Sequence, residues 1–374
     1  MLDIVILSIG GIYIILVLVT LGMFRLPKSY SAKDEELPTV SVIISAKNEE
    51  IDLPKCIVSL EKLDYPKEKL QIVLVDDKST DQTGAIIENA AQRNPHFISL
   101  TTENAPEVGL KAKARGISWG IKNSQSEWIL ITDADGEVPP LWARHMLSRV
   151  DKNTGMIGGM LSVKPSSLIG IFERISWGYT LPFAFGMAGW GASFICVGPN
   201  MGIRRSIYED KGGLENVAFD VAEDLALFRM VESSSYNFRS YVTPETTILL
   251  NPVPSLKHLW SQQRRWLGGG FEGGWKYGIP LILAFSYLTA YSFFQITGWF
   301  YALEATISIV LIRLLGDAFI LAEKRILLKK THLFRYLPIQ WLYGTLTMVW
   351  LPISLLFDSK IRWRGEGYEI KYDK

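Results

Sequence analysis

Apolar segments typical of buried strands alternate with helical patterns over the first third of the chain. The strand segments cover residues 39–45, 71–75, 98–100 and 128–132. The helical patterns lie between them and cover residues 53–62, 82–94 and 110–122, with Asp81 as a cap for the second. This alternation predicts an α/β fold with a mainly parallel sheet.

Polar residues directly follow three of these strands. The groups are Asn48-Glu49, Asp76-Asp77 and the pair Asp133 and Asp135. In open parallel sheets, ligands bind outside the carboxyl ends of the strands. The shared position of the three groups therefore predicts one ligand site at this edge of the sheet.

Asp133 and Asp135 are candidate metal ligands. Residues i and i+2 of an extended chain point the same way, so both carboxylates can face one site where the strand ends. Two hard oxygen ligands suit Mg²⁺ or Mn²⁺ holding a diphosphate. In isolation, a turn or a solvated strand edge is the competing interpretation.

The glycine loops that bind phosphate in other folds are absent. The sequence has no Gly-x-x-x-x-Gly-Lys loop, and no Gly-x-Gly-x-x-Gly follows the first strand, which argues against P-loop and dinucleotide-binding proteins. Phosphates would then be held through a metal and nearby cations. Lys111, Lys113 and Arg115 are candidate cations, and a solvated basic helix face is the alternative.

Two further polar groups lie in the second half of the chain. Glu223 and Asp224 open a helical pattern, either as a general base for an acceptor hydroxyl or as charges that complement the helix dipole. Gln262, Arg265 and Trp266 recur at helical spacing, so their side chains share a face that can bind a diphosphate and stack on a sugar. An interfacial amphipathic helix is the alternative for this second group.

Long uncharged stretches predict membrane segments at both ends. Residues 4–24 carry no charge and precede Arg25 and Lys28, which favours an anchor with a cytosolic basic flank over a cleaved signal peptide. Two further spans are expected at residues 278–300 and 303–322, of which 305–322 is apolar apart from Arg313 and Asp317, and a third element that spans or re-enters is expected at 336–357. We expect an inner-membrane protein with an anchor (1–25), a cytosolic catalytic domain (38–275), a membrane region (276–358) and a basic tail (359–374).

Charge and cysteine content narrow the function. The balance of 39 Lys and Arg against 38 Asp and Glu provides no bulk field for binding nucleic acid. Cys56 and Cys196 lack the spacing of a metal site. In a reducing cytosol both are expected to be packing residues.

Taken in order, the polar groups resemble the motifs of membrane-embedded family 2 glycosyltransferases, which include bacterial polysaccharide synthases and ceramide-glucosyltransferase-like enzymes. The matching segments are Ser45-Ala46-Lys47-Asn48-Glu49, Val75-Asp76-Asp77-Lys78-Ser79-Thr80-Asp81, Lys113-Ala114, Thr132-Asp133-Ala134-Asp135, Glu223-Asp224 and Gln262-x-x-Arg265-Trp266. Each segment is modest alone, but six in the family's order are specific. The resemblance implies a GT-A fold, a nucleotide-sugar donor and a divalent metal, Mg²⁺ or Mn²⁺. Among the donors, a UDP-sugar is the preferred candidate.

The resemblance also implies roles on the donor side. The residues that would hold the nucleoside base and ribose are Asn48, Glu49 and Asp77, with Asp76. Lys113 would lie near the diphosphate. Asp133 and Asp135 would serve the donor and the metal, with Asp135 as the preferred direct ligand.

On the acceptor side, the resemblance implies that Asp224 is the general base, with Glu223 beside it. The residues that would close over the pyrophosphate and the acceptor are Gln262, Arg265 and Trp266. We expect a single in-line displacement in which Asp224 takes the acceptor proton, while the metal and Arg265 stabilise the leaving diphosphate. The expected outcome is inversion at the anomeric carbon.

Two segments depart from the family pattern and leave the donor's identity open. Lys78 stands where the family's loop usually has Gly, and residues 115–120 replace a small-residue Asn-x-Gly run. The neighbouring membrane segments favour a lipid or lipid-linked acceptor, with a processive polysaccharide synthase that extends a glycan as the alternative. An inactive membrane scaffold is disfavoured because the expected metal and base carboxylates are intact.

Overall fold

The computed structural model describes residues 15, 18–110, 112–192, 197–216, 223–272, 354, 360–363 and 366–369 of the 374-residue chain. The chain divides into two compact units. The sheet unit comprises Leu26–Lys164 and Phe194–Asn251, and the terminal unit comprises Met1–Arg25, Pro165–Ser193 and Pro252–Lys374. The range 38–275, expected for the catalytic domain, is shared between the two.

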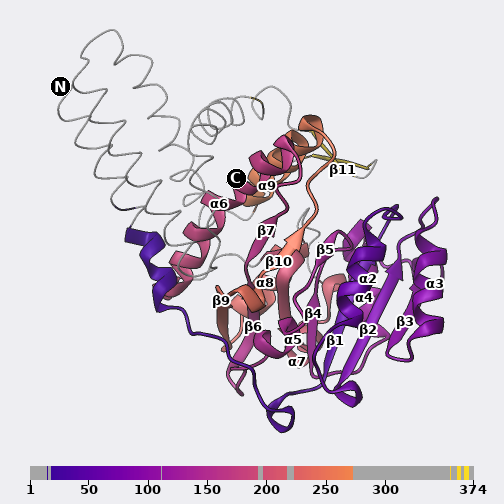
Figure 1. Cartoon of the computed structure of the whole chain (residues 1–374), viewed down its shortest axis with the longest axis horizontal. Helices are drawn as coiled ribbons and strands as arrows, with labels where there is room; N and C mark the ends of the chain where they lie inside the picture. Colours follow the sequence, from indigo (N-terminus) through magenta and orange to yellow (C-terminus); the bar gives the residue numbers. More distant parts are fainter. Residues whose placement is uncertain are drawn as a thin grey trace. The chain divides into compact units, whose positions relative to one another are not determined.

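A seven-stranded sheet organises the sheet unit (Figure 1). Its strands, in spatial order, are β3 (Phe97–Thr101), β2 (Leu70–Asp76), β1 (Val40–Ala46), β4 (Trp128–Ile131), β8 (Met201–Arg204), β6 (Thr154–Gly159) and β9 (Asn237–Tyr241). The first four are parallel, β8 is antiparallel to both of its neighbours, and β6 and β9 are parallel. The predicted α/β fold with a mainly parallel sheet is confirmed.

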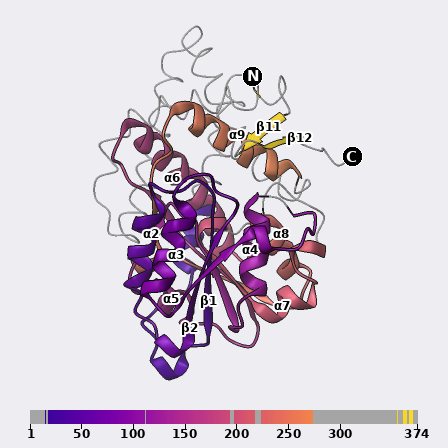
Figure 2. The ribbon, with the colours of Figure 1, turned by 90° about the vertical axis from the view of Figure 1, so that its right-hand side faces the viewer.

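Helices cover both faces of this sheet. Figure 2 shows α2 (Leu53–Glu61) and α3 (Thr83–Arg93) on one side of β1 and β2, and α4 (Ala112–Lys122) on the other. The other α-helices in the described part of this unit are α5 (Trp142–Met146), α7 (Arg205–Asp210) and α8 (Glu223–Glu232). A small second sheet has the strand order β5 (Gly136–Glu137), β10 (Ile248–Leu250) and β7 (Leu161–Val163).

Strand β1 is at the switch point of the sheet, where the strand order changes direction. From β1 the chain continues to β2 and β3 on one side, whereas β4 pairs with the opposite side of β1. Ligands of such folds bind at this switch point, outside the carboxyl ends of the strands. Val42, Ile43 and Ile44 of β1 are fully buried, and burying each such side chain contributes roughly 1.5–3 kcal/mol. The expected site therefore has a rigid base.

Two glycines let α4 approach β1 closely. A Cβ atom on Gly116 would collide with the Ser45 hydroxyl, and one on Gly120 would lie 2.6 Å from Ile43 Cγ2. Residues 115–120, which depart from the family pattern, therefore keep the small residues that this helix–strand contact requires. Near the start of α4, Gly116 lies against Ser45 of β1 and Arg115 donates to Asp77, the residue after β2.

The segment before β1 is docked onto the sheet unit. Arg144 is buried, and its guanidinium donates to the carbonyls of Ala32 and Asp64. It also pairs with the carboxylates of Asp34 at 2.8 Å and Asp64 at 3.0 Å. Residues 29–38, whose polar composition suggests a linker, are therefore part of the folded unit.

In the described part of the terminal unit, the longer elements are two helices and a pair of antiparallel strands. These are α6 (Leu168–Gly189), α9 (Leu256–Glu272) and the antiparallel pair β11 (Lys360–Trp363) and β12 (Glu366–Glu369). Within the described residues, no helix has both the length and the apolarity needed to cross a membrane. The predicted spans at 278–300 and 303–322 lie outside the described residues, as do most of 4–24 and all of 336–357 except residue 354.

Candidate active site

The loops that follow β1 and β2 are bound to each other. Asn48, in the left-handed region at φ 56°, accepts the Thr80 N–H at its Oδ1 (2.8 Å), and its own N–H donates to Ser79 Oγ (3.0 Å). The Glu49 N–H donates to Thr83 Oγ1 at 2.8 Å. The structure thus brings the first two predicted polar groups together at one edge of the sheet.

Asp77 is buried and held by a cation. Its Oδ1 accepts from Arg115 Nε (2.8 Å), Arg115 Nη2 (2.6 Å) and Thr102 Oγ1 (2.8 Å). Its Oδ2 is also buried, and no described residue donates a hydrogen bond to it. Because a buried acceptor normally has a donor, this oxygen is available to an N–H group of a ligand.

Asp76 and Lys78 shape the turn after β2. Asp76 Oδ1 accepts the Ser79 N–H at 3.2 Å, and the turn places Lys78 at φ 58°. Residues other than Gly, Asn and Asp rarely adopt this left-handed conformation because Cβ crowds the backbone. Lys78 therefore occupies a strained position at which the family's usual glycine has no such strain.

Replacing Lys78 with Gly is expected to stabilise the protein by a few tenths of a kcal/mol to about 1 kcal/mol. Relief of about 1–2 kcal/mol of left-handed strain outweighs the roughly 0.5–1 kcal/mol of extra chain entropy that glycine loses on folding. Thermal unfolding measures the effect. Lys78→Ala removes the same charge but keeps Cβ, so it is the control and should give no gain. A lower midpoint for Lys78→Gly would contradict the strain argument.

Lys113 joins three segments that are distant in sequence. Its Nζ lies 2.5 Å from Asp133 Oδ1, after β4, and 2.6 Å from Glu223 Oε1, at the start of α8. Burial acts to lower the pKa of Lys113, but the negative charges of Asp133 and Glu223 outweigh it and raise that pKa. The amine is therefore charged at neutral pH and offsets part of the acidic cluster.

Gly198 packs against the same cluster. Its N–H donates to Asp224 Oδ2 at 3.0 Å, while Asp224 Oδ1 accepts the Leu225 N–H at 2.9 Å. A Cβ atom on Gly198 would lie 3.2 Å from Asp224 Oδ2 and 3.4 Å from both Glu223 Oε1 and Lys113 Nζ. Since Gly198 is not in the left-handed region, glycine is favoured here by space and not by turn geometry.

The Asp-x-Asp pair lies in a turn and not in an extended strand. β4 ends at Ile131, and the Gly136 N–H donates to the Asp133 carbonyl at 3.1 Å. The expectation that an extended strand aligns the two carboxylates is therefore wrong, because the strand ends before Asp133. Both side chains are nevertheless half-buried, whereas Ala134 between them is buried.

The donor set around this turn suits a divalent cation. Burial is the largest cause that raises the pKa of the Cys56 thiol. Four nearby carboxylates raise this pKa further, namely those of Asp135, Asp133, Glu137 and Glu49. Mg²⁺ and Mn²⁺ bind through one or two carboxylates together with water and substrate phosphates. Among the described residues, no three or more acidic, His or Cys side chains form a metal cluster. Asp135, with Asp133, would therefore supply the protein ligands of a metal–diphosphate complex. Cys56 itself is buried, as expected of a packing residue.

The predicted set Gln262, Arg265 and Trp266 lies on α9, in the terminal unit. Burial raises the pKa of Glu173 on α6, while hydrogen bonds from the Val253 N–H (2.9 Å) and the Gln262 side chain act to lower it. Gln262 thus has a buried carboxyl partner that the sequence did not reveal. The carboxylate cluster belongs to the sheet unit.

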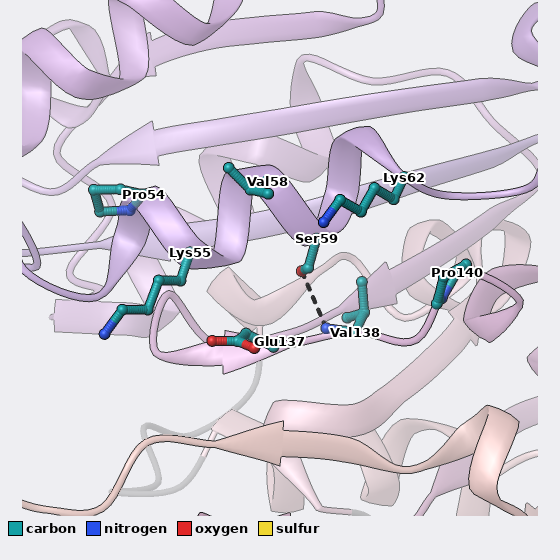
Figure 3. Close-up of a pocket in the computed structure, with 8 residues that line it drawn as sticks. All are labelled: Pro54, Lys55, Val58, Ser59, Lys62, Glu137, Val138 and Pro140. Carbon is teal, nitrogen blue, oxygen red and sulfur yellow. Dashed lines mark hydrogen bonds between the residues drawn. The ribbon is translucent and has the colours of Figure 1, made fainter.

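A groove of about 530 Å³ runs between α2 and the segment after Asp135 (Figure 3). Its walls combine apolar and basic side chains, namely Pro54, Lys55, Val58, Ser59, Lys62, Glu137, Val138 and Pro140. The Ser59 hydroxyl accepts the Val138 N–H across it at 3.1 Å. Because Glu137 is paired with Lys164, the charges of Lys55 and Lys62 give the walls of the groove a net positive charge.

Two residues that the sequence did not single out contact the candidate site. Thr102 directly follows β3 and donates to Asp77. Asn251 directly follows β10, and its N–H donates to the Asp135 carbonyl at 3.2 Å. Both follow a strand, so the rule that found the carboxylates also points to these positions. Strand β10 is too short to be recognised from its pattern.

Comparison with a solved structure identifies the fold. Mannosyltransferase PcManGT from Pyrobaculum calidifontis, solved with GDP-Man and Mn²⁺, aligns with a TM-score of 0.63 over 94% of this chain and 99% of its own, at 16% identity. The chain therefore has the GT-A fold.

Sequence comparison finds similarity to one family of transferases. The model of glycosyl transferase family 2 matches residues 41–212. The probable glycosyltransferase YdaM of Bacillus subtilis is 30% identical over 63% of this chain and 56% of its own length. Beta-monoglucosyldiacylglycerol synthase of Nostoc sp. is 24% identical over 71% of this chain and 57% of its own. The alignments thus cover just over half of the length of these relatives.

Proposed function

We propose that the protein is an inverting, metal-dependent glycosyltransferase that moves a sugar from a nucleotide-sugar donor to a lipid or lipid-linked acceptor at a membrane. The observation that carries this proposal is the Lys113 bridge. Through one amine, Asp133 of the Asp-x-Asp turn meets Glu223, which is adjacent to Asp224. This bridge supports one site shared by the carboxylates proposed for donor binding and for the base.

The nucleoside would bind between the loops after β1 and β2. Asp77 offers a single oxygen, Oδ2, because Arg115 and Thr102 occupy the other. The edge of uracil presents one N–H between two carbonyls, whereas guanine presents adjacent N–H donors that suit a carboxylate with both oxygens available. This difference favours a UDP-sugar. Asn48, Glu49 and Asp76 shape the loops around the base and ribose.

The diphosphate would lie against Asp135, Asp133 and Lys113. A bound Mg²⁺ or Mn²⁺ supplies Lewis-acid stabilisation of the leaving diphosphate. Lys113 adds a fixed positive charge from the protein side. From the terminal unit, Arg265 with Gln262 and Trp266 is proposed to contact the same diphosphate and the acceptor.

Asp224 would act as the general base. Backbone N–H groups donate to both of its oxygens, which fixes its orientation. The acceptor hydroxyl loses its proton to Asp224 as its oxygen bonds to the anomeric carbon and the sugar–diphosphate bond breaks. One displacement inverts that centre. Glu223 remains paired with Lys113 beside it.

A lipid acceptor is supported by the name of one relative, a glucosyldiacylglycerol synthase, and by the uncharged stretches at both ends of the chain. Those stretches are proposed to anchor the protein in the cytoplasmic membrane, with the sheet unit in the cytosol. The acceptor would then meet the site at the membrane surface.

The test uses purified full-length protein with Mn²⁺ or Mg²⁺, a panel of UDP-, GDP- and dTDP-sugars, and membrane lipid extract. Nucleoside diphosphate release that requires lipid and is highest with a UDP-sugar is expected, and Asp135→Ala should abolish it. The control is Glu107→Ala, which removes an exposed carboxylate in the loop before α4 and should keep full activity. Release without lipid, or products of many sugars, would overturn the single-transfer proposal.

A further inference from the structure

The turn that carries Asp135 is fastened by a network centred on Asn251. The Asn251 N–H donates to the Asp135 carbonyl at 3.2 Å. Its side chain uses both of its ends, because Nδ2 donates to Asp52 Oδ1 at 2.8 Å and Oδ1 accepts from Lys164 Nζ at 2.6 Å. One side chain therefore connects two other segments beside the turn.

These partners fix Asn251 from two directions. Asp52 is the residue before α2, and Lys164 directly follows β7. The Lys164 N–H donates to the Leu250 carbonyl at 3.0 Å, and its amine also pairs with Glu137, on the groove side of β5 (Figure 3). Gly136 and Glu137 are in turn paired with Leu250 and Leu249 of β10. Gly136, the residue after Asp135, is thus paired with β10, and Asn251 directly follows that strand.

We infer that Asn251 is a positioning residue for the metal–diphosphate site, acting through the backbone of Asp135. This inference rests on the proposed function, in which Asp135 is a metal ligand. Metal sites tolerate only small displacements of their ligands, and groups that orient the ligands typically change metal affinity by about 10–100-fold when they are removed. Asn251 orients Asp135 without touching the metal.

The chemistry of the network requires an amide at position 251. Asn supplies one donor for the Asp52 carboxylate and one acceptor for the Lys164 amine. In Asn251→Asp the acceptor remains, but two carboxylates then face each other and repel. Changing Asp52 to Asn in the same protein restores a donor–acceptor pair with the amide and the carboxylate exchanged. Recovery in the double variant would show that the hydrogen bond between positions 52 and 251 matters, and not the substitution at position 251 as such.

The test measures Mn²⁺ binding without turnover, by electron paramagnetic resonance of free Mn²⁺ in the presence of UDP. Asn251→Asp is expected to weaken Mn²⁺ binding by about 10–100-fold, and the double variant Asp52→Asn with Asn251→Asp should recover most of it. The control is Lys62→Ala, which removes an exposed cation that lines the groove outside this network and should bind Mn²⁺ as the parent does.

Thermal unfolding of the same variants separates positioning from folding. If Asn251→Asp lowers the unfolding midpoint but leaves Mn²⁺ affinity unchanged, Asn251 is structural only and the inference is wrong. If Asp135→Ala also leaves Mn²⁺ affinity unchanged, the metal assignment in the proposed function fails instead. Loss of binding in Asp135→Ala, with parental binding in Asn251→Asp, overturns the inference alone.

Discussion

Replacing Asp224 with Asn is expected to lower kcat by about 10²–10⁴-fold, the usual contribution of a general base. Asn keeps the size of the side chain but cannot take the acceptor proton. It also presents an NH₂ group where Asp224 accepts from either Gly198 or Leu225, so one backbone N–H loses its acceptor. Initial rates at saturating donor and acceptor measure the effect. The KM for the donor should change little, because Asp224 is assigned to the acceptor.

Glu223→Gln is the matched control for this experiment. It also removes one carboxylate charge from the start of α8, but Glu223 is already paired with Lys113. The expected loss in kcat is therefore much smaller than for Asp224→Asn. If Glu223→Gln abolishes turnover while Asp224→Asn keeps it, Glu223 is the base and our assignment of the pair is reversed.

Replacing Lys113 with Met is expected to lower the free energy of unfolding by about 3–5 kcal/mol, the usual effect of removing one partner from a buried ion pair. The change leaves Asp133 and Glu223 without the amine that both contact. The effect should lie near the lower end of the range, because the Asp133 side chain is 29% exposed and water can solvate it. The midpoint of thermal unfolding, followed by tryptophan fluorescence, should fall by roughly 10 °C.

Helix α4 offers a control for Lys113→Met in Lys122. Its amine pairs with Glu215 at 2.7 Å, but the Lys122 side chain is 44% exposed. Such a pair contributes about 0–1 kcal/mol, so Lys122→Met should unfold almost as the parent does. Adding Glu223→Gln to Lys113→Met removes one uncompensated charge and should recover part of the loss. Equal midpoints for Lys113→Met and Lys122→Met would show that the bridge does not stabilise the fold.

The sheet could be predicted because its strands are short runs of apolar residues followed by polar ones. The runs before Asn48, Asp76 and Asp133 form β1, β2 and β4 almost as expected. Periodicity and strand-end chemistry are local properties, so they can be read from neighbouring residues. The positions of the carboxylates at one sheet edge follow from the parallel order of these strands.

The contacts that complete the site could not be predicted in the same way. Arg115 reaches Asp77 across 38 positions, and Asn251 reaches Asp52 across 199. Such pairs depend on how helices and loops pack, and no local pattern encodes them. The docking of residues 29–38 could not be predicted for the same reason, because their partner Arg144 lies more than a hundred positions further along the chain.

The place of β8 in the sheet affects how the chain is made. Trp128, Ile129, Leu130 and Ile131 of β4 are fully buried, with β1 on one side and β8 on the other. β8 begins at Met201, so at about 5–20 residues per second the ribosome needs several seconds to supply it after β4 is complete. During that interval β4 is an apolar edge open to pairing with other chains. We therefore expect an expression fragment that ends before Met201 to aggregate through the unpaired edge of β4.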